Sequence, residues 1–302
     1  MIRMTTNGPT AIDILTDFEE YLVTDGKGEK TVSSYIGDIR IFLEWLETKD
    51  VAFSGNLTRF YITSYKEELI EKGYTINTIN KKINSLNSFN QYLISEGLCN
   101  EKVVYTRKDK IRIAQGSESE VAVFSDDEVE RILFYLENRE QVSLRDRAAI
   151  LILLYTGLRV SELVGIKIKD IDLLTLNLKV VGKGGKYREV PLKAEAAQAM
   201  KDYLDSERRA SRFTDSDYLL LTQRAGKMDK DTVNKLLRKH ARELDLVLYP
   251  HKFRHTFCTR LISKGVELTT VSKLAGHSNI HTTANFYINT SREEKHSAVN
   301  LL

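Results

Sequence analysis

The chain has 302 residues, of which 42% are hydrophobic and 29% are charged, and its formal net charge is +3. A chain of this length is expected to hold about two domains and to fold without disulfide or metal support. It has two cysteines, and its longest apolar run, Ala148 to Tyr155, is far too short to cross a bilayer. Its first ten residues are polar, unlike a signal peptide. Composition therefore excludes a disulfide scaffold and a membrane span, and we expect a cytoplasmic protein.

Residues 1–99 are predicted to form a small helical domain. Thr10 is placed to cap a first helix, in which apolar residues recur at helical spacing from Ile14 to Leu22. Three further amphipathic segments follow, with the apolar faces Tyr35–Leu46, Tyr61–Leu69 and Ile79–Leu93. Amphipathic helices joined by short turns are typical of a helical bundle.

Residues 100–123 show no clear periodicity and are predicted to be a basic interdomain linker. The stretch from Lys102 to Arg112 holds five basic residues and one acidic residue. The five basic residues are candidate contacts to a nucleic-acid backbone: Lys102, Arg107, Lys108, Lys110 and Arg112. A solvated linker would have the same composition, so charge alone leaves both interpretations open.

Residues 124–302 have a mixed pattern and are predicted to form a second domain with a C-terminal tail. Ser125 and Glu128 have the spacing of a capping box, and the apolar helix that follows at 145–155 is stopped by Gly157. Two β-rich runs, 176–181 and 187–192, flank a glycine-rich loop and predict a hairpin. Further helices are expected at 195–207, at 231–244 and from Pro250 onward. The fold class is therefore mostly α with a small β-sheet.

Two segments before residue 190 contain candidate functional residues. In the segment TGLRVSEL, residues 156–163, Arg159 and Glu162 are three positions apart, which is the spacing of neighbours on a helix. The loop GKGGKYR, residues 182–188, lacks the Ser or Thr that follows the lysine in a nucleotide-binding P-loop. A lysine at the tip of a hairpin, Lys183 or its rival Lys186, can instead act as a point charge or a proton donor.

Two later segments add histidines, an arginine and a tyrosine. The segment HKFRH places His251 and Arg254 on one face of a helix near its start, where an anion is favoured. His251, His255 and His277 have the residue types of a three-histidine zinc site, although the spacing lacks the glutamate of a metalloprotease motif. Tyr287 follows His277 by ten residues. The combined set is cationic and suits an oxyanion, and a tyrosine nucleophile would need local activation because its free pKa is near 10.

These segments, in this order, resemble the tyrosine recombinase (phage integrase) family. The resemblance rests on TGLRVSEL, GKGGKYREVPL, HKFRH, AGHS and the following tyrosine, and it extends from Ser125 to about Thr290. The layout is closest to compact Xer-type recombinases and transposon-encoded integrases. Residues 1–99 resemble the SAM-like core-binding domain of this family in their helical pattern alone.

The resemblance implies a role for each candidate residue. Arg159 and Arg254 would bind the scissile phosphate, Lys183 would protonate the 5′-oxygen leaving group, and Tyr287 would attack phosphorus. His251 would assist proton transfer, His277 would donate to a nonbridging oxygen, and Glu162 would support this network. The product would be a 3′-phosphotyrosyl link and a free 5′-hydroxyl, formed without ATP, metal or another cofactor.

The resemblance also implies an assembly. The two domains would form a C-shaped clamp on double-stranded DNA, and four protomers would act on two duplexes through a Holliday junction. The C-terminal tail would dock into a neighbouring protomer, and DNA-bending or directionality proteins are possible partners. Ala275 and Asn289 depart from the Xer pattern, which favours integration, excision or resolution of a mobile element over chromosome or plasmid dimer resolution. A DNA-binding protein without catalysis and a monomeric enzyme of the type IB topoisomerase kind remain alternatives.

Overall fold

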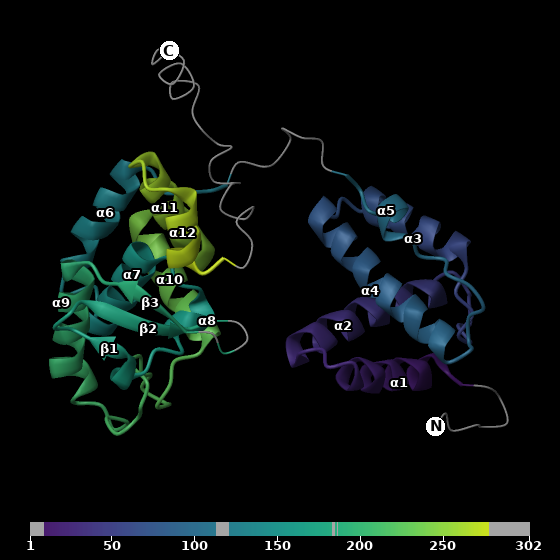
Figure 1. Cartoon of the computed structure of the whole chain (residues 1–302), viewed down its shortest axis with the longest axis horizontal. Coiled ribbons are helices and arrows are strands. Elements are labelled where there is room, and N and C mark those ends of the chain that lie inside the picture. The colour runs from purple at the N-terminus through teal and green to yellow at the C-terminus, as the bar shows by residue number, and fades with distance from the viewer. Residues whose placement is uncertain (1–8, 113–120, 183–184, 186, 278–302) are drawn as a thin grey trace, which may run out of the picture. The chain divides into compact units, whose positions relative to one another are not determined.

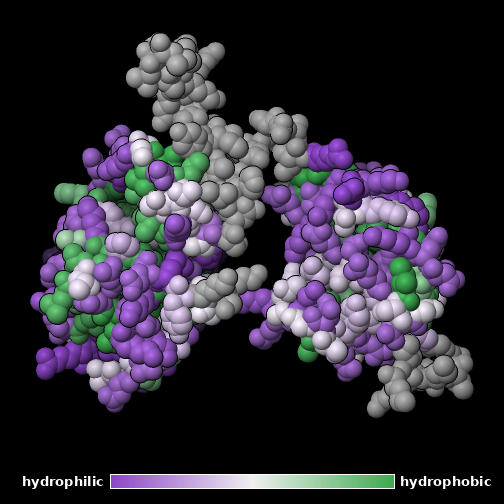
Figure 2. All heavy atoms as spheres, in the orientation of Figure 1, coloured by the Kyte–Doolittle hydropathy of each residue, from purple (hydrophilic) through white to green (hydrophobic). Residues whose placement is uncertain are grey.

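The computed structural model describes residues 9–112, 121–182, 185 and 187–277 (Figure 1). The chain divides into two compact units, Met1–Glu118 and Ser119–Leu302, each with its own hydrophobic core. Figure 2 shows that the visible surface is largely hydrophilic and is interrupted by hydrophobic patches. Across the described ranges, every helix is too short or too polar to span a membrane.

The first unit is the predicted helical bundle. Its helices are α1 (Ala11–Thr24), α2 (Glu29–Glu47), α3 (Arg59–Glu71), α4 (Ile76–Ser95) and the short α5 (Thr106–Asp109). Thr10 caps α1 through a capping box with Asp13, as its position in the sequence predicts. Phe18, Phe42 and Phe89 are fully buried and bring α1, α2 and α4 together in one core.

The segment from residue 100 to Arg112 packs onto the first unit, and this corrects the linker predicted at 100–123. Val103 and Val104 are buried, and their backbone N–H groups donate to Asn90 on α4. Asp109 on α5 is buried and forms an ion pair with Arg59 on α3. The first unit therefore extends past residue 99, because Val103, Val104 and Asp109 bind side chains on α3 and α4.

The second unit combines helices with one small sheet, as predicted. Its helices are α6 (Asp126–Leu136), α7 (Leu144–Thr156), α8 (Val160–Leu163), the 3₁₀ turn η1 (Ile168–Asp170), α9 (Ala194–Tyr203), the π-helical turn η3 (Leu204–Arg208), α10 (Lys230–Leu244), α11 (Pro250–Ser263) and α12 (Leu268–Ala275). Its antiparallel strands, in sheet order, are β1 (Ile171–Asp172), β2 (Asn177–Val181) and β3 (Tyr187–Pro191). The β2–β3 hairpin confirms the prediction, whereas β1 is too short to leave a pattern in the sequence.

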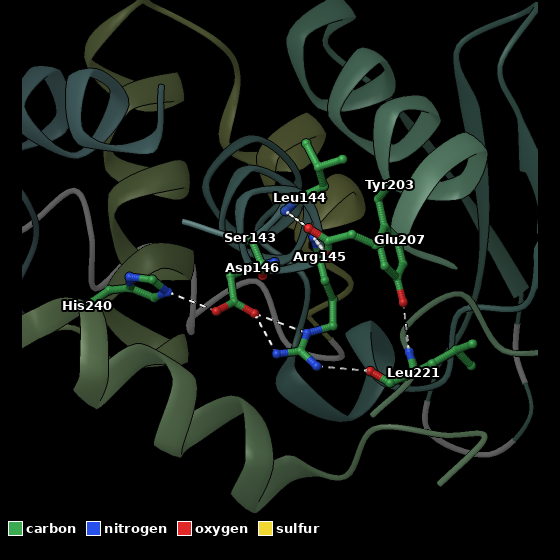
Figure 3. Close-up of polar contacts among 8 residues, drawn as sticks. All are labelled: Ser143, Leu144, Arg145, Asp146, Tyr203, Glu207, Leu221 and His240. Atoms are coloured by element: carbon green, nitrogen blue, oxygen red, sulfur yellow. Dashed lines mark hydrogen bonds and ion pairs between the residues drawn. The ribbon is translucent and has the colours of Figure 1, made fainter. Parts of the chain in front are cut away.

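Helix α7 is the central helix of the second unit. Residues 148–154 are all buried, because α7 is apolar on nearly every face and packs against both α9 and α11. Its first turn is held by polar contacts (Figure 3). Ser143 caps the helix by accepting from Asp146, and Glu207 accepts from the first two backbone N–H groups. Asp146 also binds Arg145 and the buried His240, so the start of α7 is fixed to η3 and α10.

Gly157 ends α7 in a left-handed conformation with φ of 60°. Its N–H donates to Leu153, and its carbonyl oxygen accepts from Arg254 on α11. A β-carbon at this position would overlap the Phe257 ring, so glycine is required both by the backbone angle and by the space. The turn that contains Arg159 therefore requires α11 to pack closely against Gly157.

Gly157→Ala is expected to lower the free energy of unfolding by roughly 2–4 kcal/mol, because overpacking adds to the cost of positive φ. Gly265→Ala is the matched control, since Gly265 has φ of 79° with open space around its α-carbon. The control is expected to lose roughly 1 kcal/mol. Urea denaturation of both variants measures the difference, and equal losses would show that contact with Phe257 does not matter.

Candidate active site

Arg159 lies in the turn between α7 and α8. It is the N-cap residue of α8, and its backbone N–H donates to Oε2 of Glu162 over 2.8 Å. Its Nη1 donates to Oε1 of Glu162 at 3.2 Å, and its Nη2 donates to the carbonyl oxygen of Gly276 at 2.8 Å. The Glu162 side chain is only 4% exposed, so the pair predicted from the spacing is a buried anchor and not a solvated ion pair.

Arg254 is the fifth residue of α11 and is 3% exposed. Its Nη1 donates to the carbonyl oxygen of Gly157 at 2.7 Å. Its Nη2 is buried and has no hydrogen-bond partner in the described part of the chain. Burial, followed by the positive charge of Arg159, lowers the pKa of Arg254 to about 10. A buried guanidinium with a free donor beside a second cation favours an anionic ligand.

The histidines lie close enough to these arginines to be affected by their charge. His251 is in the first turn of α11, and His277 directly follows the C-terminal end of α12. Burial is the main cause that lowers the pKa of His251, and Arg254 and Arg159 add to it. The same causes, in the same order, lower the pKa of His277 to about 4. Both imidazoles are therefore neutral at pH 7, and each can donate an N–H without adding charge.

The structure adds Arg188, a residue that the sequence motifs did not single out. Its Nη1 and Nη2 donate to the two carboxylate oxygens of Glu162 at 2.8 and 3.0 Å, and its Nε donates to the carbonyl oxygen of Leu274 at 3.1 Å. Burial opposes ionisation of Glu162, but hydrogen bonds from Arg188 and from the backbone of Arg159 outweigh it and lower its pKa. One signal was present in the sequence: Arg188 is two residues before the buried Val190, on the same side of the strand.

Gly276 allows Arg188 to reach α12. It ends α12 with φ of 69°, and a β-carbon there would lie 2.7 Å from Cζ of Arg188. Two arginines consequently bind the last carbonyl groups of α12, at Leu274 and at Gly276. Cations at a helix C-terminus also stabilise it through the helix dipole. The segment that contains His277 is thereby fixed to β3 and to the α7–α8 turn.

Several predicted residues are not brought into this geometry. Lys183, Lys186, Tyr287 and Asn289 lie outside the described residues. The five basic residues from Lys102 to Arg112 belong to the first unit, where Arg107 and Lys108 are exposed on α5. The residues of the zinc alternative, His251, His255 and His277, do not form a metal-ligand group, and within the described ranges no other such group is found.

The site is thus a cationic cluster in which Glu162 forms ion pairs with both Arg159 and Arg188. Arg159 and Arg254, which we call the arginine pair, lie beside neutral His251 and His277. Fixed donors in a partly buried setting stabilise negative charge on oxygen more strongly than water does. The geometry therefore fits a phosphate group, and the side chains present supply its countercharge.

Acidification is expected to destabilise the fold through His277. Its pKa is about 4 in the folded chain, against an ordinary value of about 6.5, so the unfolded chain binds a proton first as the pH falls. The stability that His277 contributes is complete above pH 6.5 and is lost as the pH falls toward 4. Urea midpoints at pH 7 and pH 5 should therefore differ more for the wild type than for His277→Gln, and equal differences in the two proteins would contradict the assignment.

Comparison with known proteins gives two family matches. Residues 122–294 match the phage integrase family, and residues 15–97 match the phage integrase N-terminal SAM-like domain. The TnP I resolvase of Bacillus thuringiensis is 32% identical over 300 residues, which cover 96% of this chain and all of the resolvase. The tyrosine recombinase XerC of Bacillus subtilis is 31% identical over 291 residues and 91% of each chain.

Solved structures give the same fold. The Tn1549 transposon integrase, in complex with a circular intermediate DNA, superimposes with a TM-score of 0.72 at 22% identity. The match covers 95% of this chain and 98% of the integrase chain. The family models, the full-length relatives and the arginine pair agree, and the chain belongs to the phage integrase family of tyrosine recombinases.

Proposed function

We propose that this chain is a site-specific DNA recombinase that cuts and rejoins double-stranded DNA through a 3′-phosphotyrosyl intermediate. One observation carries the proposal: the buried Nη2 of Arg254 lacks a partner in the described ranges and lies in the same cluster as Arg159 and two neutral histidines. A DNA phosphodiester is the anion that the family acts on, and it would satisfy this donor. Membership of the family supports a DNA strand-transfer enzyme.

The arginine pair would bind the nonbridging oxygens of the scissile phosphate. A guanidinium presents parallel N–H donors that match a phosphate, which favours arginine over lysine here. His277 would donate its N–H to one of these oxygens as charge develops on it. Glu162 would keep Arg159 in place and would not bind the phosphate itself, because its oxygens already accept from two arginines.

Tyr287 would attack phosphorus through its phenol oxygen, and the bond from phosphorus to the 5′-oxygen would break. His251, neutral at pH 7, would assist removal of the phenol proton, and Lys183 would give a proton to the departing 5′-oxygen. Attack by a 5′-hydroxyl on the phosphotyrosine would reverse these steps and rejoin a strand. The ester keeps its bond energy throughout, so the reaction would need no ATP, and side chains would replace a metal as countercharge.

The partners of the chain follow from this chemistry. Double-stranded DNA is the substrate, and the exposed basic residues near α5 would bind its backbone. We propose that the two units close on the duplex as a C-shaped clamp, and that four protomers assemble on two sites with the C-terminal tail docked into a neighbour. Accessory DNA-bending or directionality proteins would act on this assembly.

The biological role that we favour is integration, excision or resolution of a mobile element. A resolvase is 32% identical along its whole length, and a transposon integrase shares the fold. Chromosome or plasmid dimer resolution of the Xer type is the second candidate, because XerC of Bacillus subtilis is similar over nearly as much of the chain.

Tyr287→Phe should abolish a covalent protein–DNA adduct. The assay uses nicked duplexes from the DNA that flanks the gene, in EDTA, followed by denaturing electrophoresis. The wild type is expected to form an adduct, since departure of the short nicked strand prevents religation. Tyr74→Phe in the first unit is the control that keeps the adduct.

An adduct that persists in Tyr287→Phe would rule out this nucleophile. Specific binding without any adduct would favour the DNA-binding alternative, and disappearance of the adduct in EDTA would favour a metal enzyme. A monomeric enzyme of the type IB topoisomerase kind would form the adduct but would give no recombinant strands from two duplexes.

Arg107→Gln with Lys108→Gln should weaken DNA binding and reduce its salt dependence. Removal of one phosphate-binding charge is expected to lower the slope of log K against log salt by about 0.9. Fluorescence anisotropy at several salt concentrations measures the slope. Lys30→Gln with Arg40→Gln, at two exposed basic residues of the first unit, is the charge-matched control. An unchanged slope in the double variant would show that Arg107 and Lys108 do not contact DNA phosphates and are only solvated.

A further inference from the structure

Residues 121–125, which we call the strap, precede α6 and pack against α11, the helix that contains His251 and Arg254. Val121 packs on the small apolar cluster that includes Cys258 of α11. Phe124 belongs to the main core, together with Phe253 of α11. The strap and α11 therefore contribute side by side to both apolar clusters of the second unit.

Phe124 is held on α11 through its backbone and through its ring. Its backbone N–H donates to Oγ1 of Thr256 at 2.8 Å, and the same hydroxyl donates to the carbonyl oxygen of Lys252 at 2.9 Å. The rings of Phe124 and Phe253 pack edge to face with their centroids 4.9 Å apart, and Nζ of Lys252 lies 4.2 Å from the centroid of the Phe124 ring. The strap is therefore bound to one side of α11, at residues 252, 253 and 256.

This contact is on the face of α11 opposite Arg254. Successive residues of an α-helix are rotated by about 100°, which places Lys252 and Thr256 each about 160° from Arg254. On the Arg254 side, Nη1 donates to the carbonyl oxygen of Gly157, and the Phe257 ring packs closely on the same glycine. Helix α11 is thus held between the end of α7 on one face and the strap on the other.

The hydroxyl of Thr256 gives the strap contact its direction. Apolar packing is non-directional, so the contact of Phe124 with Phe253 allows a helix to turn or slide slightly, whereas a hydrogen bond fixes distance and angle. Thr256 is completely buried, and its hydroxyl already donates and accepts within the protein. It therefore has no role in binding substrate, and its effect on the site must act through the position of α11.

We propose that Thr256 is a positioning residue, which aligns Arg254 with the scissile phosphate by fixing the strap to the opposite face of α11. The inference rests on the proposed function, in which Arg254 binds a nonbridging oxygen. The buried Nη2 of Arg254 lacks a partner within the described ranges, so its direction depends on where α11 lies and on the bond from Nη1 to Gly157. Loss of the Thr256 hydroxyl would loosen α11 and misalign this donor.

The test compares two scissile groups in nicked duplexes. One is the natural phosphodiester. The other is a methylphosphonate, in which a methyl group replaces one nonbridging oxygen and removes the negative charge. A neutral group depends less on the countercharge of Arg254. A defect in Arg254 therefore slows the phosphodiester more than the methylphosphonate, whereas a defect in folding or in the nucleophile slows both by the same factor.

The main variant is Thr256→Val, which keeps the shape of the side chain and removes the hydroxyl. Thr256→Ser keeps the hydroxyl, Arg254→Ala is the reference, and Thr214→Val is the control at an exposed threonine of the same unit. Phe124→Leu removes the ring contacts without changing charge, so it carries the test if Thr256→Val does not fold. Adduct rates at saturating protein, DNA affinity and melting temperature are measured for each variant.

Thr256→Val is expected to slow adduct formation on the phosphodiester by roughly tenfold to 100-fold. On the methylphosphonate it should lose less than about threefold, so the ratio of the two rates falls as it does for Arg254→Ala. Phe124→Leu should lower the ratio in the same direction. Thr256→Ser and Thr214→Val should keep the ratio of the wild type, although Thr256→Ser will melt at a lower temperature because it lacks the buried methyl group.

Two results would overturn the inference: unchanged rates in Thr256→Val, or rates that fall by the same factor on both substrates, which would limit Thr256 to stability. The proposed function fails separately. A wild type that forms no adduct on the phosphodiester would refute the recombinase chemistry. An Arg254→Ala variant that gains nothing from the methylphosphonate would refute the role of Arg254 and the inference with it.

Discussion

The buried carboxylate of Glu162 is the interaction on which the arrangement of the site depends. One carboxylate accepts from a backbone N–H and from two guanidinium groups, which come from different elements. A buried ion pair of this kind adds little net stability, because desolvation offsets the attraction. Its contribution is geometric, since Arg159 and Arg188 must both reach the same two oxygens. The packing of these elements therefore determines where the Arg159 side chain lies.

The second constraint is an excess of positive charge that the side chains of the described residues do not neutralise. Glu162 is shared by Arg159 and Arg188, while Arg254 keeps a buried donor without a partner in the described ranges. Burial and these charges keep His251 and His277 neutral at pH 7. The site is therefore prepared for an anion before DNA arrives, which is the condition for electrostatic stabilisation without reorganisation.

Helix α7 links these constraints to the core. Its first turn is held by Glu207 and by the contact of Asp146 with His240. Its end at Gly157 meets α11 closely enough that only glycine fits. Helix α7 is packed on nearly all sides, and a close-packed core resists small displacements. Its two ends are therefore held at fixed positions relative to each other. Arg159 and Arg254 are thus placed by one packed contact, in which the end of α7 meets the start of α11.

Local structure and most of the candidate site residues could be predicted from the sequence. Periodicity, capping residues and glycines placed the helices and the hairpin, because each depends on residues a few positions apart. The motifs also selected Arg159, Glu162, His251, Arg254 and His277, which the structure brings into one region.

Features that depend on contacts between distant parts of the chain could be seen only in the folded structure. The strand pattern places Arg188 on the same side as Val190, but its partners Glu162 and Leu274 come from other elements and are known only from the fold. Burial of Val103 and Asp109 was likewise hidden, because Asn90 and Arg59 supply their partners from helices packed against them. The free donor of Arg254 is also a result of packing: a motif specifies which side chain is present, and the fold decides which of its hydrogen bonds are satisfied.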